Sequence, residues 1–371
     1  KKMNQPTLQQ KIPSQVLQDR YWRLNNLYYI KDDKGNNVLF KFNEIQEFLY
    51  RRVWFLNLIL KARQHGITTF FCILFLDDTL FAGMNSAIVA HTIIAAQDIF
   101  DTKVKYAFDR LPVSLKENWK VDFNNVRMLK FKQDKKESWI YVGTSLRGGT
   151  NQRLLITELG TLDQKFPTKS EEIKTGAFNT VHICQIVAIE STAKGRYGNF
   201  YELSTEAQKL DQQKKELTPM DYRFFFFPWF EKKEYILDKL TVIPREMQDY
   251  FSKIESETGV LLTRPQKNWY YKKSLIMKDA MKSEFPSTPA EAFLASIEGA
   301  YYGKVIAKIL ERRQITYVPW EPKFKVDTWW DLGIAKGRDS MSIIFSQTIG
   351  MQIRIIDFYA NSGEGLAHYI K

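Results

Sequence analysis

Short apolar runs separated by polar loops recur along much of the chain. Asn57–Leu60, Leu154–Ile156 and His182–Ile189 each have the character of a buried strand, and Thr68–Phe81 is apolar enough for a largely buried helix. Apolar strands that alternate with helices predict a parallel sheet, whose ligands collect at the carboxyl ends of its strands. The pattern therefore predicts an α/β fold in which the segments after these strands form the functional site.

A second group of segments extends this pattern toward the C-terminus. Glu206–Glu216 is densely charged, which predicts a solvated helix, and Phe224–Phe227 follows as a buried strand. Around Tyr301–Pro322, basic residues and prolines interrupt the pattern, which indicates a domain boundary. Successive strands are expected beyond it, over Thr328–Leu332, Ser342–Phe345 and Gln352–Phe358. We therefore expect an N-terminal arm (1–20), an α/β domain (21–300), a linker (301–322) and a C-terminal unit (323–371).

The chain is basic, with 54 Lys and Arg against 42 Asp and Glu and a net charge of +12. This balance favours a polyanionic partner such as DNA, although a basic excess can also serve solubility alone. The longest apolar run, Phe70–Leu76, is too short to span a membrane. Cys72 and Cys184 lack zinc-site spacing, and we expect both as buried thiols in a reducing compartment. These features predict a soluble cytoplasmic protein.

The segment from Lys61 to Thr68 partly fits the phosphate-binding pattern G-x-x-x-x-G-K-[ST]. Gly66 and Thr68 fit, whereas Lys61 occupies the first glycine position and Ile67 the usual lysine position. Taken alone, an ordinary strand-to-helix turn explains the segment equally well.

Two further polar positions follow apolar strands. Glu158 ends the Leu154–Ile156 strand region after Thr157, and Ser191 and Thr192 follow the third strand. A helix-capping or surface glutamate and an ordinary Ser-Thr turn are the alternatives at these positions.

In their order along the chain, these segments resemble the large terminase subunit of tailed bacteriophages. K-A-R-Q-H-G-I-T-T looks like the deviant phosphate loop of that family, in which the lysine stands at the loop's start. The resemblance implies that Lys61 replaces the missing lysine and that Thr68 holds the Mg²⁺ of ATP. It places further nucleotide contacts at Gln46, which would read adenine, and at Arg63, Gln64, Gly66 and Thr69.

The same resemblance assigns roles in hydrolysis. Glu158 would activate the attacking water, and Thr157 stands where a first acid is expected, so Mg²⁺ would rest on Thr68, water and nucleotide oxygens. Ser191 and Thr192 match the motif that couples hydrolysis to movement. Arg147 resembles the arginine that a neighbouring subunit inserts at the transition state, although it could instead contact DNA.

The C-terminal segment resembles the start of the terminase nuclease, an RNase H-like fold. Trp329-Trp330-Asp331-Leu332-Gly333 supplies Asp331 as the central ligand of divalent metal, Mg²⁺ or Mn²⁺, and Asp339 follows as an accessory ligand. We expect Asp357 to be structural. The family's remaining acids lie on later segments, so we expect these residues alone to cut DNA poorly.

The resemblance thus implies a RecA-like (ASCE P-loop) ATPase domain followed by a partial RNase H-like nuclease domain. Its function would be ATP-driven translocation of double-stranded DNA into a procapsid in the host cytoplasm, by a homo-oligomeric ring on the portal protein that works with a small terminase subunit. Glu284–Phe293 resembles the segment that closes the ATPase region, and we expect Glu291 to be exposed.

Two alternatives stay open. A helicase-like translocase would share the ATP site but has no use for Asp331 and Asp339. A non-hydrolysing nucleic-acid-binding protein with a decayed phosphate loop would explain Ile67 and Thr157.

Overall fold

The computed structural model describes residues 13–32, 34–124, 127–133, 136–146, 150–176, 180–239, 241–294, 309, 312–332, 341–361 and 364–370. The chain forms two compact units, residues 1–299 and 300–371. Each unit has its own sheet.

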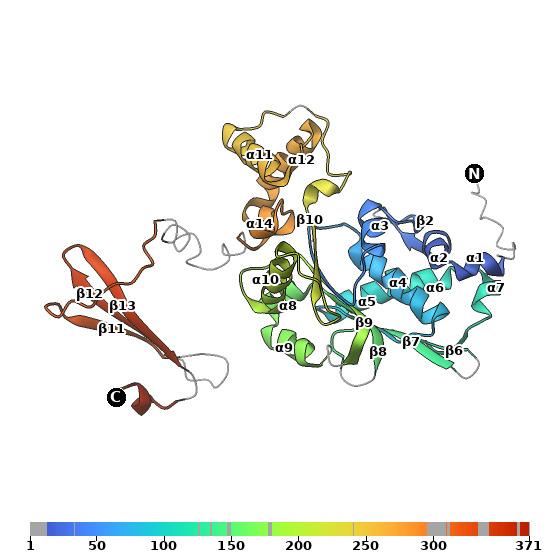
Figure 1. Ribbon diagram of the computed structural model, residues 1–371, viewed down its shortest axis with the longest axis horizontal. Coiled ribbons are helices and arrows are strands. Elements are labelled where there is room, and N and C mark those ends of the chain that lie inside the picture. The colour runs from blue at the N-terminus through green and yellow to red at the C-terminus, as the bar shows by residue number, and fades with distance from the viewer. Residues whose placement is uncertain are drawn as a thin grey trace. The chain divides into compact units, whose positions relative to one another are not determined.

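A mostly parallel sheet is the centre of the larger unit (Figure 1). In the part of the chain that the structure describes, eight strands pair in the order β10 (Tyr222–Phe227), β3 (Leu56–Lys61), β9 (Val181–Ser191), β8 (Asn151–Thr157), β4 (Ser86–Val89), β7 (Lys136–Gly143), β6 (Met128–Gln133) and β5 (Lys120–Asn124). The first six are parallel, and β6 is antiparallel to both β7 and β5.

The order of the strands identifies the fold class. β3, β4, β8, β9 and β10 come in this order along the chain, with β5–β7 between β4 and β8, yet β9 lies between β3 and β8 in the sheet. This strand order is that of a RecA-like fold, and the predicted α/β class is therefore confirmed. The predicted strands over Asn57–Leu60, Leu154–Ile156 and His182–Ile189 are the cores of β3, β8 and β9, which extend further at both ends.

Helices cover both faces of this sheet (Figure 1). On one side lie α2 (Arg20–Asn26), α3 (Glu44–Tyr50), α4 (Ile67–Phe81), α5 (Ile93–Ile99), the π-helical η1 (Phe100–Lys105) and α6 (Tyr106–Asp109). On the other lie α8 (Leu159–Lys165), α9 (Pro167–Gly176) and α10 (Gly198–Gln212). β3 shows why both faces are covered: Ile59 joins one core, and Leu58 and Leu60 join the other, because successive side chains alternate.

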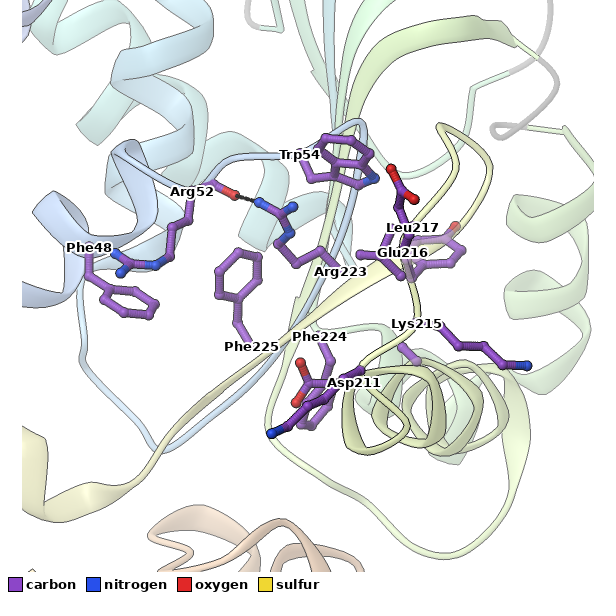
Figure 2. Close-up of a pocket in the computed structure, with 13 residues that line it drawn as sticks. Phe48, Arg52, Trp54, Asp211, Lys215, Glu216, Leu217, Arg223, Phe224 and Phe225 are labelled. Atoms are coloured by element: carbon purple, nitrogen blue, oxygen red, sulfur yellow. Dashed lines mark hydrogen bonds between the residues drawn. The ribbon is translucent and has the colours of Figure 1, made fainter.

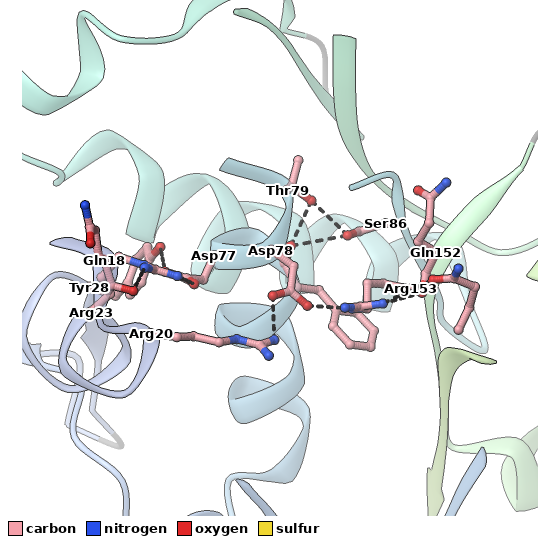
Figure 3. Close-up of polar contacts among 12 residues, drawn as sticks. Gln18, Arg20, Arg23, Tyr28, Asp77, Asp78, Thr79, Ser86, Gln152 and Arg153 are labelled. Atoms are coloured by element: carbon pink, nitrogen blue, oxygen red, sulfur yellow. Dashed lines mark hydrogen bonds and ion pairs between the residues drawn. The ribbon is translucent and has the colours of Figure 1, made fainter. Parts of the chain in front are cut away.

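The N-terminal region is held to α4 by ion pairs with two buried aspartates (Figure 3). Arg23 donates to Asp77 at 2.7 Å, and Asp78 pairs with both Arg20 and Arg153. Arg20, the last residue of the expected arm, is the first residue of α2. It is preceded by α1 (Ser14–Gln18) and followed by a small ribbon of β1 (Tyr29–Lys31) and β2 (Asn37–Leu39). The rest of the arm, residues 1–12, lies outside the described residues.

A group of helices follows β10 in the same unit. It comprises η3 (Trp229–Glu231), α11 (Arg245–Thr258), α12 (Arg264–Met277), η4 (Lys278–Ala280), α13 (Met281–Glu284) and α14 (Pro289–Leu294). Its core is aromatic, with Trp229, Phe251, Tyr270 and Phe285 among the buried members. We call it the helical cluster.

Three sequence-based expectations are wrong in the larger unit. Glu291 is 7% exposed rather than solvated, because its carboxylate accepts from the Tyr250 hydroxyl and the Ser287 backbone N–H. Cys184 is exposed, although Cys72 is buried as expected. The charged helix expected over Glu206–Glu216 is α10, which begins earlier, at Gly198, and has ended by Gln212.

The smaller unit has an antiparallel sheet of β11 (Val326–Asp331), β12 (Met341–Ile349) and β13 (Gln352–Asn361), with β12 in the middle. α16 (Leu366–Tyr369) follows. All three strands predicted there are present. β11 begins and ends earlier than predicted, β12 is longer at both ends, and β13 ends later. The larger unit contains one further described helix, α7 (Val113–Lys116), between α6 and β5.

Candidate active site

The loop between β3 and α4 has the shape of a phosphate loop. β3 ends at Lys61, and α4 begins at Ile67 after Gly66, whose φ of +75° strongly favours glycine. A Cβ at Gly66 would lie 2.8 Å from the amide nitrogen of Gln46. α4 has 15 residues, and its first backbone N–H groups form a place for an anion.

Lys61 lies between two glutamates at the carboxyl ends of other strands. Its Nζ is 3.4 Å from Oε1 of Glu158, which follows β8, and 3.0 Å from Oε2 of Glu190, near the end of β9. Burial disfavours the charge of Lys61, but Glu190 and Glu158 outweigh it and raise the pKa of its ammonium well above the usual value. Lys61 is therefore a buried cation that stays charged.

Glu158 combines a strained backbone with a reachable carboxylate. Its φ of 56° is in the left-handed region, and its backbone N–H donates to the carbonyl of Glu190 at 2.7 Å. Its side chain is 29% exposed, so that a bound ligand or water can reach it while Lys61 holds one oxygen. Strain of this kind is often retained where it positions a functional group.

Glu190 is a site residue that sequence reasoning missed. It is fully buried, and the hydroxyl of Thr68 donates to its Oε1 at 2.6 Å. Thr68 was expected to hold Mg²⁺, and its neighbour here is a carboxylate from β9 rather than from β8. A signal was available in the sequence, since Glu190 ends the same apolar run that precedes Ser191 and Thr192.

Ser191 and Thr192 lie directly behind Glu158. The Ser191 hydroxyl accepts from the backbone N–H of Gly160 at 3.1 Å and lies 3.5 Å from Oε2 of Glu158. A Cβ at Gly160 would lie 2.8 Å from the Thr192 carbonyl oxygen, so only glycine permits this approach. The end of β9 and the start of α8 are therefore in direct contact.

Gln46 lies at the phosphate loop, but its amide is already engaged. Its Nε2 donates to the carbonyl of Gly66 at 2.9 Å, and its Oε1 accepts from the backbone N–H of Asn43 at 3.0 Å. It lines a pocket of about 490 Å³ together with Gln64, Gly66 and Thr69. The pocket is thus placed beside the loop, where the base of a bound nucleotide could lie.

Arg63 points to the helical cluster. It forms an ion pair with Glu284, the last residue of α13, and Lys194 pairs with the other oxygen of the same carboxylate. Burial opposes the charge of Glu284, but bonds from Arg63 and Lys194 hold the pKa of its carboxyl below the usual value. Neither Glu284 nor Lys194 was singled out from the sequence.

Of the remaining predicted site residues, the structure describes only Asp331. Arg147 and Asp339 lie outside the described residues. Asp331 is the last residue of β11 in the smaller unit, where it is exposed. Among the residues that the structure describes, no three metal-ligating side chains form a cluster. No described helix is both long and apolar enough to cross a membrane.

A second pocket, of about 590 Å³, lies at the opposite end of β10 (Figure 2). The Arg223 guanidinium lies 4.6 Å from the centre of the Trp54 ring, and the Arg52 guanidinium 4.1 Å from that of Phe48. Its lining includes the first four residues of β10 and none of the phosphate loop. It is therefore separate from the site around Lys61.

No protein-family model and no curated protein sequence matches the chain. Among solved structures, the large terminase ATPase domain of Thermus phage P74-26 is 16% identical, with a TM-score of 0.41, over 67% of this chain and 94% of that chain. The large terminase of another thermophilic bacteriophage is 10% identical, with a TM-score of 0.36, over 89% and 72%. The Phi-28 gp11 DNA packaging motor is 11% identical, with a TM-score of 0.31, over 85% and 78%. All three identities are below 25% and all three TM-scores are below 0.5, so these similarities do not assign a function to the chain.

Proposed function

We propose that the chain is an ATPase that drives double-stranded DNA through a terminase-like packaging motor. The observation that carries the proposal is the approach of Lys61 to Glu158, 3.4 Å apart at the ends of two non-adjacent strands. A cation at the phosphate loop that faces a reachable carboxylate is the pairing that phosphoryl transfer to water requires.

The residues around the loop suit MgATP. Backbone N–H groups at the start of α4 would cradle phosphate, and Lys61 would offset its charge. Thr68 would lie at the metal, and Thr69 lines the pocket beside the loop, where Gln46 and Gln64 would border the base. Arg63 would join the phosphates after leaving Glu284.

Glu158 would orient the attacking water and take up its proton. Its partly exposed carboxylate can reach water, while Ser191 contacts it from behind. A movement of the Glu158 side chain would therefore change the contacts of Ser191 and its neighbour Thr192. We propose these two as the coupling residues. Arg147 would come from a neighbouring copy of the chain.

The proposed partners follow from the charge and from the family resemblance. A net charge of +12 suits a DNA backbone. We propose a ring of copies on a portal protein, with a small terminase subunit, acting in the host cytoplasm. Nuclease activity, which we expect to be weak in these residues alone, would use Asp331 and Asp339 with Mg²⁺ or Mn²⁺. Robust Mn²⁺-dependent cleavage that Asp331→Ala abolishes and that Asp327→Ala, on the same strand, keeps would contradict the expected weakness.

The test is ATP turnover with and without DNA. We expect turnover that double-stranded DNA stimulates, with loss of at least about a hundredfold in Lys61→Ala and Glu158→Gln. Lys209→Ala and Glu206→Gln, both exposed on α10, are the matched controls and should keep the wild-type rate. Stimulation by single-stranded DNA alone would favour the helicase-like alternative, and DNA binding without turnover would favour the non-hydrolysing one.

A further inference from the structure

We infer that Glu190, on β9, supplies the carboxylate of the nucleotide's magnesium site. Its strand is next to β8, where the resembling family has that acid and this chain has Thr157. The inference rests on the proposed function, because it concerns the metal that accompanies ATP. It differs from the sequence-based expectation, in which Thr157 left the site without an acid.

The sheet places Glu190 where it can replace the acid missing at Thr157. β8 and β9 are parallel, and Thr157 and Glu190 are direct partners in their register. A side chain at either position therefore reaches the same edge of the sheet. Thr157 is buried and carries no charge, so that Glu190 is the acid at this level of the two strands.

Thr68 identifies what Glu190 does there. In P-loop ATPases the hydroxyl at this loop position and a strand-end carboxylate together hold Mg²⁺. Here the Thr68 hydroxyl donates to Oε1 of Glu190 at 2.6 Å, a short bond of the kind that a charged acceptor gives. The two groups that the metal would need are thus already adjacent.

The burial of Glu190 is a second reason to assign it to the metal. Glu190 is 0% exposed, and a buried carboxylate is costly unless other groups compensate for it. Lys61 neutralises part of the charge at 3.0 Å from Oε2, but it also pairs with Glu158. One ammonium faces two carboxylates, and a divalent cation would therefore favour the binding of a triphosphate here by offsetting the remaining negative charge.

A purely structural role of Glu190 predicts a different effect of its removal on nucleotide affinity. If Glu190 only anchored Lys61, its removal would weaken nucleotide binding equally with and without metal. If Glu190 serves the metal, its removal would abolish the advantage that Mg²⁺ gives to binding, while binding without metal would stay the same or improve. The ratio of the two affinities separates these roles without any measurement of turnover.

The experiment measures ATPγS affinity in Mg²⁺ and in EDTA, and Mn²⁺ binding by electron paramagnetic resonance in the presence of ATPγS. The ATPγS affinity of wild type should be roughly 10- to 100-fold higher in Mg²⁺ than in EDTA, and that of Glu190→Gln should be almost the same in both. Glu158→Gln is the matched control, since it removes a carboxylate that also contacts Lys61 but leaves the metal's acid in place, and it should keep the gain.

A second variant, in which the acid is moved to β8, distinguishes loss of the metal site from a failure of Glu190→Gln to fold. Thr157→Asp in the Glu190→Gln background returns a carboxylate to the same edge and should restore the gain from Mg²⁺ and the Mn²⁺ signal. An unchanged gain in Glu190→Gln, or no restoration by Thr157→Asp, would overturn the inference while nucleotide binding by wild type leaves the proposed function standing. Absence of nucleotide binding in wild type would overturn both.

Discussion

Arg63 and Glu284 join the phosphate loop to the helical cluster twice. Their side chains form an ion pair, and the backbone N–H of Arg63 donates to the carbonyl of Glu284 at 3.1 Å. A phosphate at the loop and the carboxylate of Glu284 would compete for the same guanidinium. Nucleotide binding and the position of α13 should therefore depend on each other.

Glu284→Gln should raise the affinity for ATPγS. Without the carboxylate, Arg63 and Lys194 lose their protein partner and become available to phosphate. Because Arg63 is more than half exposed, we expect only about a two- to fivefold gain, measured by a fluorescence titration. Glu255→Gln, which breaks the Lys267 pair in the same helical cluster, should leave the affinity unchanged. A weaker affinity in Glu284→Gln would contradict the competition.

Lys61→Met should destabilise the fold as well as block nucleotide binding. It leaves the carboxylates of Glu158 and Glu190 close together without a cation, at a cost of about 3 kcal/mol in the free energy of unfolding. Urea denaturation measures this loss. The double variant Lys61→Met/Glu190→Gln should be less destabilised than the sum of the two single variants, and simple additivity would refute the coupling.

His65 should make stability depend on pH. Burial, assisted by Lys61 and Lys232, lowers the pKa of its imidazole to about 3. The unfolded chain takes up a proton below about pH 6.5 and the folded protein does not, so stability is full above that pH and falls as the pH decreases toward 3.

Between pH 7 and pH 5, wild type should lose about 2 kcal/mol more than His65→Gln in urea denaturation. His182→Gln, at an exposed histidine, is the control and should follow wild type. Identical pH profiles for wild type and His65→Gln would contradict the burial of a neutral imidazole.

Asp78→Asn should destabilise the larger unit by about 3 kcal/mol, because it leaves the buried guanidinium of Arg153 without its carboxylate and loosens Arg20. Thermal or urea unfolding measures the effect, and Asp98→Asn, at an exposed position of α5, should change stability little. An equal, small effect of both substitutions would show that the ion pairs of Figure 3 contribute little.

Local pattern predicted the strands and the loop because each depends on neighbouring residues. β3, the phosphate loop and α4 are consecutive, so that apolar runs and Gly66 were enough to find them. Lys61 and Glu158 could be expected in one site because each lies at the carboxyl end of a strand in a parallel sheet.

Contacts between distant segments were harder to predict. The bond from Thr68 to Glu190 spans 122 residues, and only the register of β8 and β9 shows that Glu190 lies opposite Thr157. Glu284 ends the short helix α13, and nothing in the sequence of that helix indicates its ion pair with Arg63. Glu291 was expected to be exposed because a glutamate near prolines usually is, and the buried hydroxyl of Tyr250 could not be foreseen.

The pairing of β10 with β3 connects the phosphate loop directly to the helical cluster through the backbone. Phe227 is the register partner of Lys61, and its carbonyl accepts from the N–H of Ala62 at 2.9 Å. Trp229, two residues later, is a fully buried member of the aromatic core of that cluster. A shift of Lys61 along its strand would thus be transmitted to the start of the helical cluster through main-chain bonds, which substitutions other than proline leave in place.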